Sequence, residues 1–259
     1  MFNLNTGLFT YIFPDGGTAF EFWSIYLIFV IISIAASYLF GSINSAIIIS
    51  KVIYHDDIRR HGSGNAGTTN MLRTYGKSAA LMTLVGDMLK TALAVFVCGI
   101  LFGFNYVGGV STGEGYCYMA GLFAVLGHVF PVYYGFKGGK GVLSTATMAL
   151  ILCPIPFLIL LAVFIGIVAL SKYVSLGSVC GAILLPIILN GYFTLKFSLP
   201  PPGLASLSVI ILAILIVWCH RENLKRISNR TERKLSFKKR PEAKAEEAAV
   251  AEDTGDQDE

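Results

Sequence analysis

Long apolar segments recur along the whole chain, and they constrain its fold more than any other feature of the sequence. A helix rises about 1.5 Å per residue, so crossing a hydrocarbon core of about 30 Å takes roughly 20 apolar residues. Segments of this kind cover residues 22–43, 79–104, 115–134, 177–197 and 203–219. Only 14% of the residues are charged, whereas soluble domains carry about a quarter. The sequence therefore predicts an all-α integral membrane protein.

The stretch 141–171 is also apolar, but it is too long for one upright span and short for two. Prolines in Cys153-Pro154-Ile155-Pro156 favour a turn between two short helices. With two helices here, one side of the membrane receives 18 of the 20 Lys and Arg residues, those in 51–77, in 137–140, at Lys172 and from Arg221 onwards. The positive-inside rule makes that side the cytoplasm. We expect about seven transmembrane helices, with the N-terminus out, the C-terminus in and the substrate loops on the cytoplasmic face.

The chain divides into three parts by composition. Residues 1–220 hold the apolar segments and form the polytopic membrane domain, and residues 221–240 form a basic cytoplasmic segment. After Arg240 the sequence "PEAKAEEAAVAEDTGDQDE" has eight acidic residues and few apolar ones beyond alanine. Such a segment cannot bury enough apolar surface to fold, so 241–259 is expected to be a disordered acidic tail.

A glycine-rich loop, Gly62 to Gly67, fits the dinucleotide fingerprint G-x-G-x-x-G letter for letter. A nucleotide-binding fold needs a strand before this loop, but apolar segments flank it here, so that interpretation fails. The glycines still allow successive N–H groups to form a concave anion site. A flexible polar loop explains the charges but not the clustered glycines. The loop is expected to bind phosphate through Gly62, Ser63, Gly64, Asn65, Thr68 and Asn70, with Arg59, Arg73 and Lys77 as nearby cations.

A second glycine cluster precedes the next apolar segment, in Phe136-Lys137-Gly138-Gly139-Lys140-Gly141. Gly138, Gly139 and Gly141 can expose backbone N–H groups, and Lys140 supplies a charge. The N-terminus of the following helix adds a field that favours an anion. This loop is therefore a second candidate phosphate site.

Three ionisable groups lie within the expected spans. Asp87 and Lys90 are three residues apart on one helix face and can neutralise each other, and His128 lies near the cytoplasmic end of its helix. Charge inside a membrane is costly and often functional. Two alternatives remain open from the sequence: a functional ion pair with a catalytic histidine, or a pair that fixes helix packing beside a structural histidine.

Two further polar clusters face the same side, "KYVSLGS" with Ser175 and "HRENLKR" with His220 and Asn223. Together the four clusters predict a site for an anionic, water-soluble substrate at the cytoplasmic membrane surface. No carboxylate cluster suggests a metal, so no metal, cofactor or nucleic acid is expected to bind.

These motifs together resemble one family. "YLFGSINSAIIISK", "DIRRHGSGNAGTTNMLRTYGK", "GDMLK", "GHVFPVYYGFKGGKGV", "KYVSLGS" and "HRENLKR" are similar, in order, to segments of the bacterial acyl-phosphate-dependent glycerol-3-phosphate acyltransferases, the PlsY family. The resemblance runs from about Tyr38 to Glu232. It implies a seven-helix enzyme of the bacterial cytoplasmic (inner) membrane. Such an enzyme transfers a fatty acyl group from acyl phosphate to the 1-hydroxyl of sn-glycerol 3-phosphate. The products are lysophosphatidic acid and phosphate, in the first step of phospholipid synthesis.

The resemblance also implies residue roles. Phosphate binding falls to Arg59, Gly62, Ser63, Gly64, Asn65, Lys140 and Gly141, and substrate contacts lie near Ser42, Ser175, His220 and Asn223. The chain departs from the family pattern at Asn44, Thr68 and Thr91, where proline, alanine and glycine are usual, and none of these removes a charged position.

The mechanism and one competing function remain open. We expect Arg59 and Lys140 to hold the two phosphates. The proton of the glycerol hydroxyl could pass to His128, to His220 or to a phosphate oxygen of the substrate, and we expect the phosphate oxygen to accept it. The competing function is an organophosphate-anion transporter. Transporters place their charges near the midplane, whereas these lie near one face.

Overall fold

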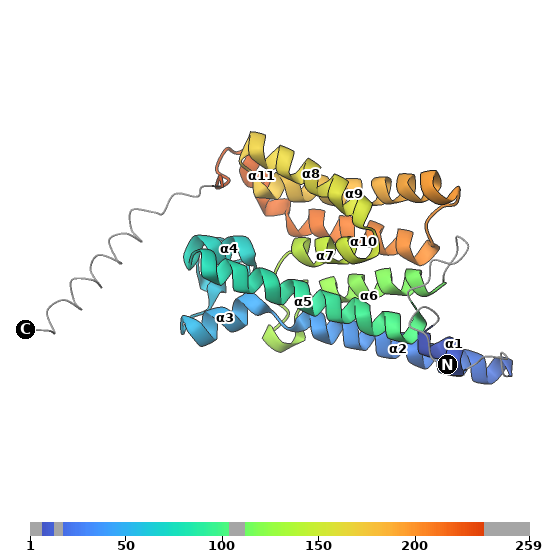
Figure 1. Ribbon diagram of the computed structural model, residues 1–259. Coiled ribbons are helices and arrows are strands. Elements are labelled where there is room, and N and C mark those ends of the chain that lie inside the picture. Colours follow the sequence, from blue (N-terminus) through green and yellow to red (C-terminus); the bar gives the residue numbers. More distant parts are fainter. Residues whose placement is uncertain (1–6, 13–17, 104–111, 236–259) are drawn as a thin grey trace, which may run out of the picture.

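The structure is a computed structural model that describes residues 7–12, 18–103 and 112–235, and every regular element in these ranges is a helix (Figure 1). The α-helices are α1 (Gly7–Ile12), α2 (Ala19–Ser42), α3 (Ser45–Ile53), α4 (Thr68–Thr74), α5 (Lys77–Phe102), α6 (Thr112–Val129), α7 (Val142–Leu152), α8 (Pro154–Ser171), α9 (Val174–Phe197), α10 (Gly203–Cys219) and α11 (Arg221–Ser228). Two 3₁₀ turns, η1 (Ile58–Arg60) and η2 (Val132–Tyr134), lie in the loops. The acidic tail 241–259 lies outside the described residues.

The all-α membrane fold is confirmed. Five segments of the described chain are long and apolar enough to cross a membrane, and α10 with α11, bent by 50°, makes a sixth candidate. The helix α8 shows the membrane character most clearly, because Pro156 is its one buried residue although its sequence is almost wholly apolar. Such a surface suits lipid and not water. The count of seven spans and the orientation stay predictions.

The proline-rich break in 141–171 is confirmed. The short helix α7 ends at Leu152, and α8 begins at Pro154, where a proline is tolerated because a first-turn residue has no helical partner for its N–H. At 11 residues α7 is too short to cross a bilayer, and it packs in the interior instead. Gly121 of α6 lies directly under Met148 of α7, where a Cβ would overlap the methionine side chain. The middle of α7 is thereby fixed against α6.

The helices α2 and α6 approach closely near their polar ends. A Cβ on Gly41 would overlap the carbonyl of Ala124, and one on Gly127 would overlap the carbonyl of Tyr38. Just beyond, α2 ends at Ser42, and Asn44 starts α3 by accepting from the N–H of Ile47 at 3.1 Å. This break turns the chain along the membrane surface toward the first glycine loop.

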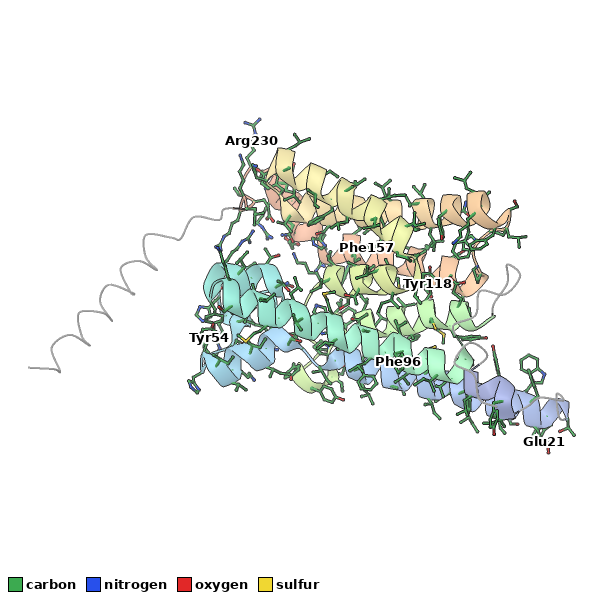
Figure 2. The ribbon with its side chains drawn as sticks, viewed as in Figure 1. Glu21, Tyr54, Phe96, Tyr118, Phe157 and Arg230 are labelled. Carbon is green, nitrogen blue, oxygen red and sulfur yellow. The ribbon has the colours of Figure 1, made fainter. Side chains whose placement is uncertain are left out.

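Most of the polar side chains gather at one end of the bundle. In Figures 1 and 2, α3, α4 and α11 lie at the end that carries Tyr54 and Arg230, whereas Glu21 marks the opposite end. The helix α4 contacts α5, and α11 contacts α9 and α10. Four loops from distant parts of the sequence therefore meet at this end.

Candidate active site

The first glycine loop is shaped by Asn70, which lies behind it in α4. The buried Asn70 side chain accepts from the N–H of Ser63 at 3.0 Å and donates to the carbonyls of His61 at 3.0 Å and Ile58 at 3.3 Å. Gly62 and Gly64 have φ of 60° and 71°, a region that glycine enters at no steric cost. Asn70 therefore folds the loop rather than facing solvent, while Gly62, Ser63 and Gly64 themselves are exposed.

Arg59 joins this loop to the second one. Its Nε and Nη2 donate to the Asp57 carboxylate at 2.9 and 2.7 Å, and its Nη1 donates to the carbonyls of Tyr134 at 2.9 Å and Lys137 at 3.3 Å. The hydrogen bonds from Arg59 lower the pKa of Asp57 to about 2, and the same bonds raise the pKa of Arg59. The pair is thus ionised, and the guanidinium crosses from η1 to the loop after η2.

The second glycine loop rests on the end of α6. The N–H groups of Gly138 and Gly139 donate to the carbonyls of Val129 at 3.1 Å and His128 at 3.0 Å. A Cβ on Gly138 would overlap that His128 carbonyl, and one on Gly139 would overlap the imidazole of His128 while lying 2.8 Å from the Ala66 carbonyl oxygen. The two glycine loops therefore meet above His128, and only glycine fits there. The expectation that Gly138 and Gly139 expose free N–H groups is wrong, because both groups are hydrogen-bonded to carbonyls at the end of α6.

Lys140 projects from this loop toward α11. Its ammonium donates to Oδ1 of Asn223. Burial lowers the pKa of Lys140 to about 8, with Arg226 and Arg73 acting in the same direction and Glu232 opposing them. A half-buried cation among other cations is electrostatically suited to an anionic ligand.

Glu232 links three parts of the chain on the far side of Asn223. Its carboxylate accepts from Ser175 Oγ at 2.9 Å, from Asn223 Nδ2 at 2.7 Å and from Arg226 Nε at 2.7 Å. Burial alone would raise the pKa of Glu232, but these hydrogen bonds outweigh it and the pKa is lowered. The structure thus brings Ser175, Asn223 and Lys140 into one chain of contacts, and the sequence analysis did not name Glu232 as a site residue.

His220 lies at the end of α10 and Ser42 at the end of α2. Nδ1 of His220 lies 2.8 Å from the carbonyl of Ile216. A carbonyl only accepts, so Nδ1 carries the proton and Nε2 keeps its lone pair. Ser42 Oγ donates to the Tyr38 carbonyl at 2.8 Å and accepts from the N–H of Val132 at 3.4 Å, which ties α2 to η2.

The remaining expected residues divide into two groups. Arg73 reaches the C-terminal segment, where it donates to the Arg233 carbonyl at 3.4 Å, whereas Lys77 is exposed at the first residue of α5. Hydroxyls of residues just after the glycine loops are buried and lack a hydrogen-bond partner in the described structure: Thr68 Oγ1, Ser144 Oγ and Thr145 Oγ1. Ser144 and Thr145 were missed from the sequence, because two apolar residues separate them from Gly141, whereas Thr68 directly follows Gly67.

Asp87, Lys90 and His128 form a buried group beneath both loops. The Lys90 ammonium lies 2.8 Å from Asp87 Oδ1 and 2.8 Å from His128 Nδ1, and it donates to the Ile43 carbonyl at 2.9 Å. The expected ion pair is therefore present, and it contacts the histidine as well.

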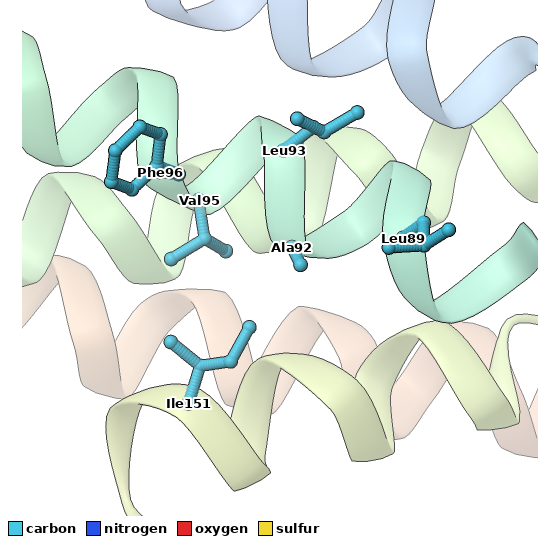
Figure 3. A pocket seen from close by; sticks show the side chains of 6 residues that line it. All are labelled: Leu89, Ala92, Leu93, Val95, Phe96 and Ile151. Atoms are coloured by element: carbon cyan, nitrogen blue, oxygen red, sulfur yellow. The ribbon is translucent and has the colours of Figure 1, made fainter. Parts of the chain in front are cut away.

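An apolar groove of about 370 Å³ lies farther along α5 (Figure 3). It is lined by Leu89, Ala92, Leu93, Val95 and Phe96 of α5 and by Ile151 of α7. A lining without polar side chains suits an alkyl chain and not an anion, so the groove is separate from the polar cluster.

Comparison with known proteins gives one consistent family. The family model described as glycerol-3-phosphate acyltransferase matches residues 31–230. The glycerol-3-phosphate acyltransferase of Clostridioides difficile is 42% identical over 212 residues, covering 82% of this chain and 97% of the relative. That of Syntrophomonas wolfei is 39% identical and covers 78% and 94%.

Two solved structures agree with this match. They are crystal structures of PlsY (YgiH), an integral membrane glycerol 3-phosphate acyltransferase, in its glycerol 3-phosphate form and its lysophosphatidic acid form. The TM-scores are 0.69 and 0.67, at 30% and 29% identity, and each comparison covers 80% of this chain, with 96% and 95% of the respective neighbour. This chain belongs to the glycerol-3-phosphate acyltransferase family.

Proposed function

We propose that this protein transfers a fatty acyl group from acyl phosphate to the 1-hydroxyl of sn-glycerol 3-phosphate, yielding lysophosphatidic acid and phosphate. The observation that carries the proposal is the junction of the two glycine loops with the Lys140–Asn223 contact. It offers exposed glycine backbone, a half-buried ammonium and buried hydroxyls within one end of the bundle. Two phosphate groups, one on each substrate, are the ligands that such a surface would bind.

The reaction needs little covalent help from the protein. The glycerol hydroxyl oxygen forms a bond to the acyl carbon, the bond from that carbon to the phosphate oxygen breaks, and the hydroxyl proton passes to an oxygen of the departing phosphate. Positioning the two substrates and stabilising the growing charge would supply most of the acceleration. Lys140 is the proposed electrostatic stabiliser, and Arg59 holds the loops together or contacts a phosphate directly. His220 Nε2 is the competing proton acceptor.

We place the site at the cytoplasmic face of a bacterial inner membrane. The end of the bundle that holds the site contains α4, with Arg73, and the basic helix α11 (Figure 1). Arg59 contacts the second glycine loop, and Lys140 of that loop contacts α11. An excess of Lys and Arg on one side is the property that orients membrane proteins with that side inward. Glycerol 3-phosphate would then arrive from water and the acyl phosphate from the bilayer.

An organophosphate transporter is the alternative, and one observation favours it. Asp87 and Lys90 are charged and buried inside a span, as in many transporters. Their partners are the Ile43 carbonyl and His128, however, both at the polar end of the bundle. The charges therefore underlie the surface site and do not mark a midplane pathway.

The test gives purified protein palmitoyl phosphate and labelled glycerol 3-phosphate and measures lysophosphatidic acid together with released phosphate. We expect both products in equal amounts. Uptake of label into proteoliposomes without product would refute the acyltransferase and support the transporter. Lys140→Ala and Arg59→Ala should each abolish turnover while the protein inserts normally, and near-normal activity would remove the substituted residue from the site. Gly181→Ala, at a glycine with open space around it, is the control.

A further inference from the structure

The buried ammonium of Lys90 contacts three different parts of the chain. It meets the Asp87 carboxylate on its own helix, the Ile43 carbonyl at the α2–α3 break and Nδ1 of His128 at the end of α6. The side chains of Lys90 and Asp87 are only 4% and 2% exposed, so water does not compete for these contacts. The ammonium thus makes two hydrogen-bond contacts, with a carbonyl and with an imidazole nitrogen, and an ion pair with a carboxylate.

The contact with His128 fixes the state of its ring. An ammonium has donors and no acceptor, so Nδ1 of His128 must accept, and the proton of the neutral imidazole lies on Nε2. That Nε2 faces the Cα of Gly139, on the side where the Ala66 carbonyl also lies. The histidine therefore presents a donor, and not a lone pair, to the place where the two glycine loops meet.

The same group sets the position of both loops. The second loop is hydrogen-bonded to the end of α6: the N–H groups of Gly138 and Gly139 donate to the carbonyls of Val129 and His128. The first loop reaches the α2–α3 break through Asn44, whose Nδ2 donates to the Ala66 carbonyl at 3.5 Å. Asn44 directly follows Ile43, whose carbonyl accepts from Lys90, and His128 contacts the same ammonium. The ammonium therefore contacts the segments on which both loops are supported.

We infer that Lys90, with Asp87 as its counter-ion, is a positioning residue for the acyl transfer proposed above: it locks His128 as the Nε2–H tautomer and so holds the two glycine loops at their working separation. His128 then packs between the two loops and donates a hydrogen bond from Nε2, and it does not abstract the substrate proton. This inference rests on the proposed function only for its catalytic consequence. The tautomer is a property of the folded chain alone.

Two substitutions at His128 separate positioning from base catalysis. In His128→Asn the amide oxygen can take the place of Nδ1 and accept from Lys90, but no titrating group remains. In His128→Leu the acceptor is lost and the ammonium loses one of its three partners. We expect His128→Leu to lower kcat/KM for glycerol 3-phosphate about a hundredfold, which is what a misplacement of about 1 Å costs, with KM raised. His128→Asn should recover most of this loss. An asparagine variant as inactive as the leucine variant would overturn the inference.

A spectroscopic measurement tests the tautomer without turnover. The chain has four histidines, so the ¹⁵N spectrum of histidine-labelled protein, compared with that of His128→Asn, identifies the ring signals of His128. We expect a protonated Nε2 and an unprotonated Nδ1 in the neutral ring. A protonated Nδ1 would overturn the inference, whatever the reaction is. If the wild type makes no lysophosphatidic acid but shows the expected tautomer, the proposed function fails while the Lys90–His128 lock stands.

Discussion

Replacing Glu232 should weaken the site from a distance, by an amount that follows from its three contacts. Glu232→Ala removes the acceptor of Ser175 and Asn223, which are 7% and 8% exposed, and of Arg226, whose side chain is 42% exposed. A hydrogen bond to a charged group contributes about 1.5–3 kcal/mol, while a solvent-exposed ion pair contributes about 1 kcal/mol or less. Allowing for water that enters the vacated space, we expect a loss of about 3 kcal/mol.

Glu232→Gln is the matched control. Its amide oxygen still accepts from Ser175 and Asn223, but the two bonds become neutral and the exposed pair with Arg226 is lost, so about 1.5 kcal/mol is expected. The difference of about 1.5 kcal/mol corresponds to a factor of about 10 in an equilibrium constant. Because Asn223 also accepts from Lys140, the alanine variant should show a lower kcat/KM as well as a lower Tm than the glutamine variant.

Thermal unfolding in detergent and initial rates with glycerol 3-phosphate measure these effects. The pH dependence has a fixed sign: the folded pKa of Glu232 lies below 4.5, so its stabilisation is complete above that value and is lost as the pH falls through the folded pKa. Equal Tm and equal kcat/KM in the alanine and glutamine variants would refute the reasoning. The hydrogen bonds from Ser175 and Asn223 to the side-chain oxygen at position 232 would then contribute nothing to stability or activity.

Three further predictions follow from the surroundings of Lys140 and Gly139. Binding of glycerol 3-phosphate should weaken as the pH rises through about 8, where Lys140 loses its charge. It should not weaken there in Lys140→Arg. Calorimetry that shows no weakening in the wild type would exclude Lys140 as a charged contact of glycerol 3-phosphate. The stability should rise with pH between about 8 and 10.5, because unfolding then takes up a proton. Gly139→Ala should lower kcat/KM about a hundredfold, because the new methyl overlaps His128. Gly181→Ala, with open space around it, should have no such effect. Similar rates for the two variants would show that activity does not depend on the close contact between the second glycine loop and His128.

Much of the fold could be predicted because it depends on local properties of the chain. Apolar length gives the membrane helices, and Pro154 gives the break between α7 and α8. The two glycine loops were recognised because positive φ and close packing of the backbone both require glycine in the sequence itself. These signals need no knowledge of distant residues.

The connections within the site could not be predicted, because tertiary packing creates them. Ser175 and Glu232 are 57 residues apart and Lys90 and His128 are 38 apart, and no local pattern pairs them. Asn70 was expected to bind phosphate, but its hydrogen bonds fold the loop, a distinction that depends on which way one side chain points. Sequence identified the chemical groups, and only the packed helices decide which of them face the ligand.

The two histidines considered as bases differ in a way that bears on the route of the proton. Nδ1 of His128 accepts from an ammonium, whereas Nδ1 of His220 donates to a carbonyl, so the Nε2 atoms carry opposite roles. Of the two, only His220 therefore offers a lone pair, and burial, together with the Lys140 ammonium, lowers the pKa of His220 to about 4. In the proposed reaction, an oxygen of the departing phosphate would gain negative charge as the acyl bond breaks, at the moment when the hydroxyl proton is released. Lys140 would stabilise that charge and so favour departure of the phosphate, while the same cation disfavours a protonated His220.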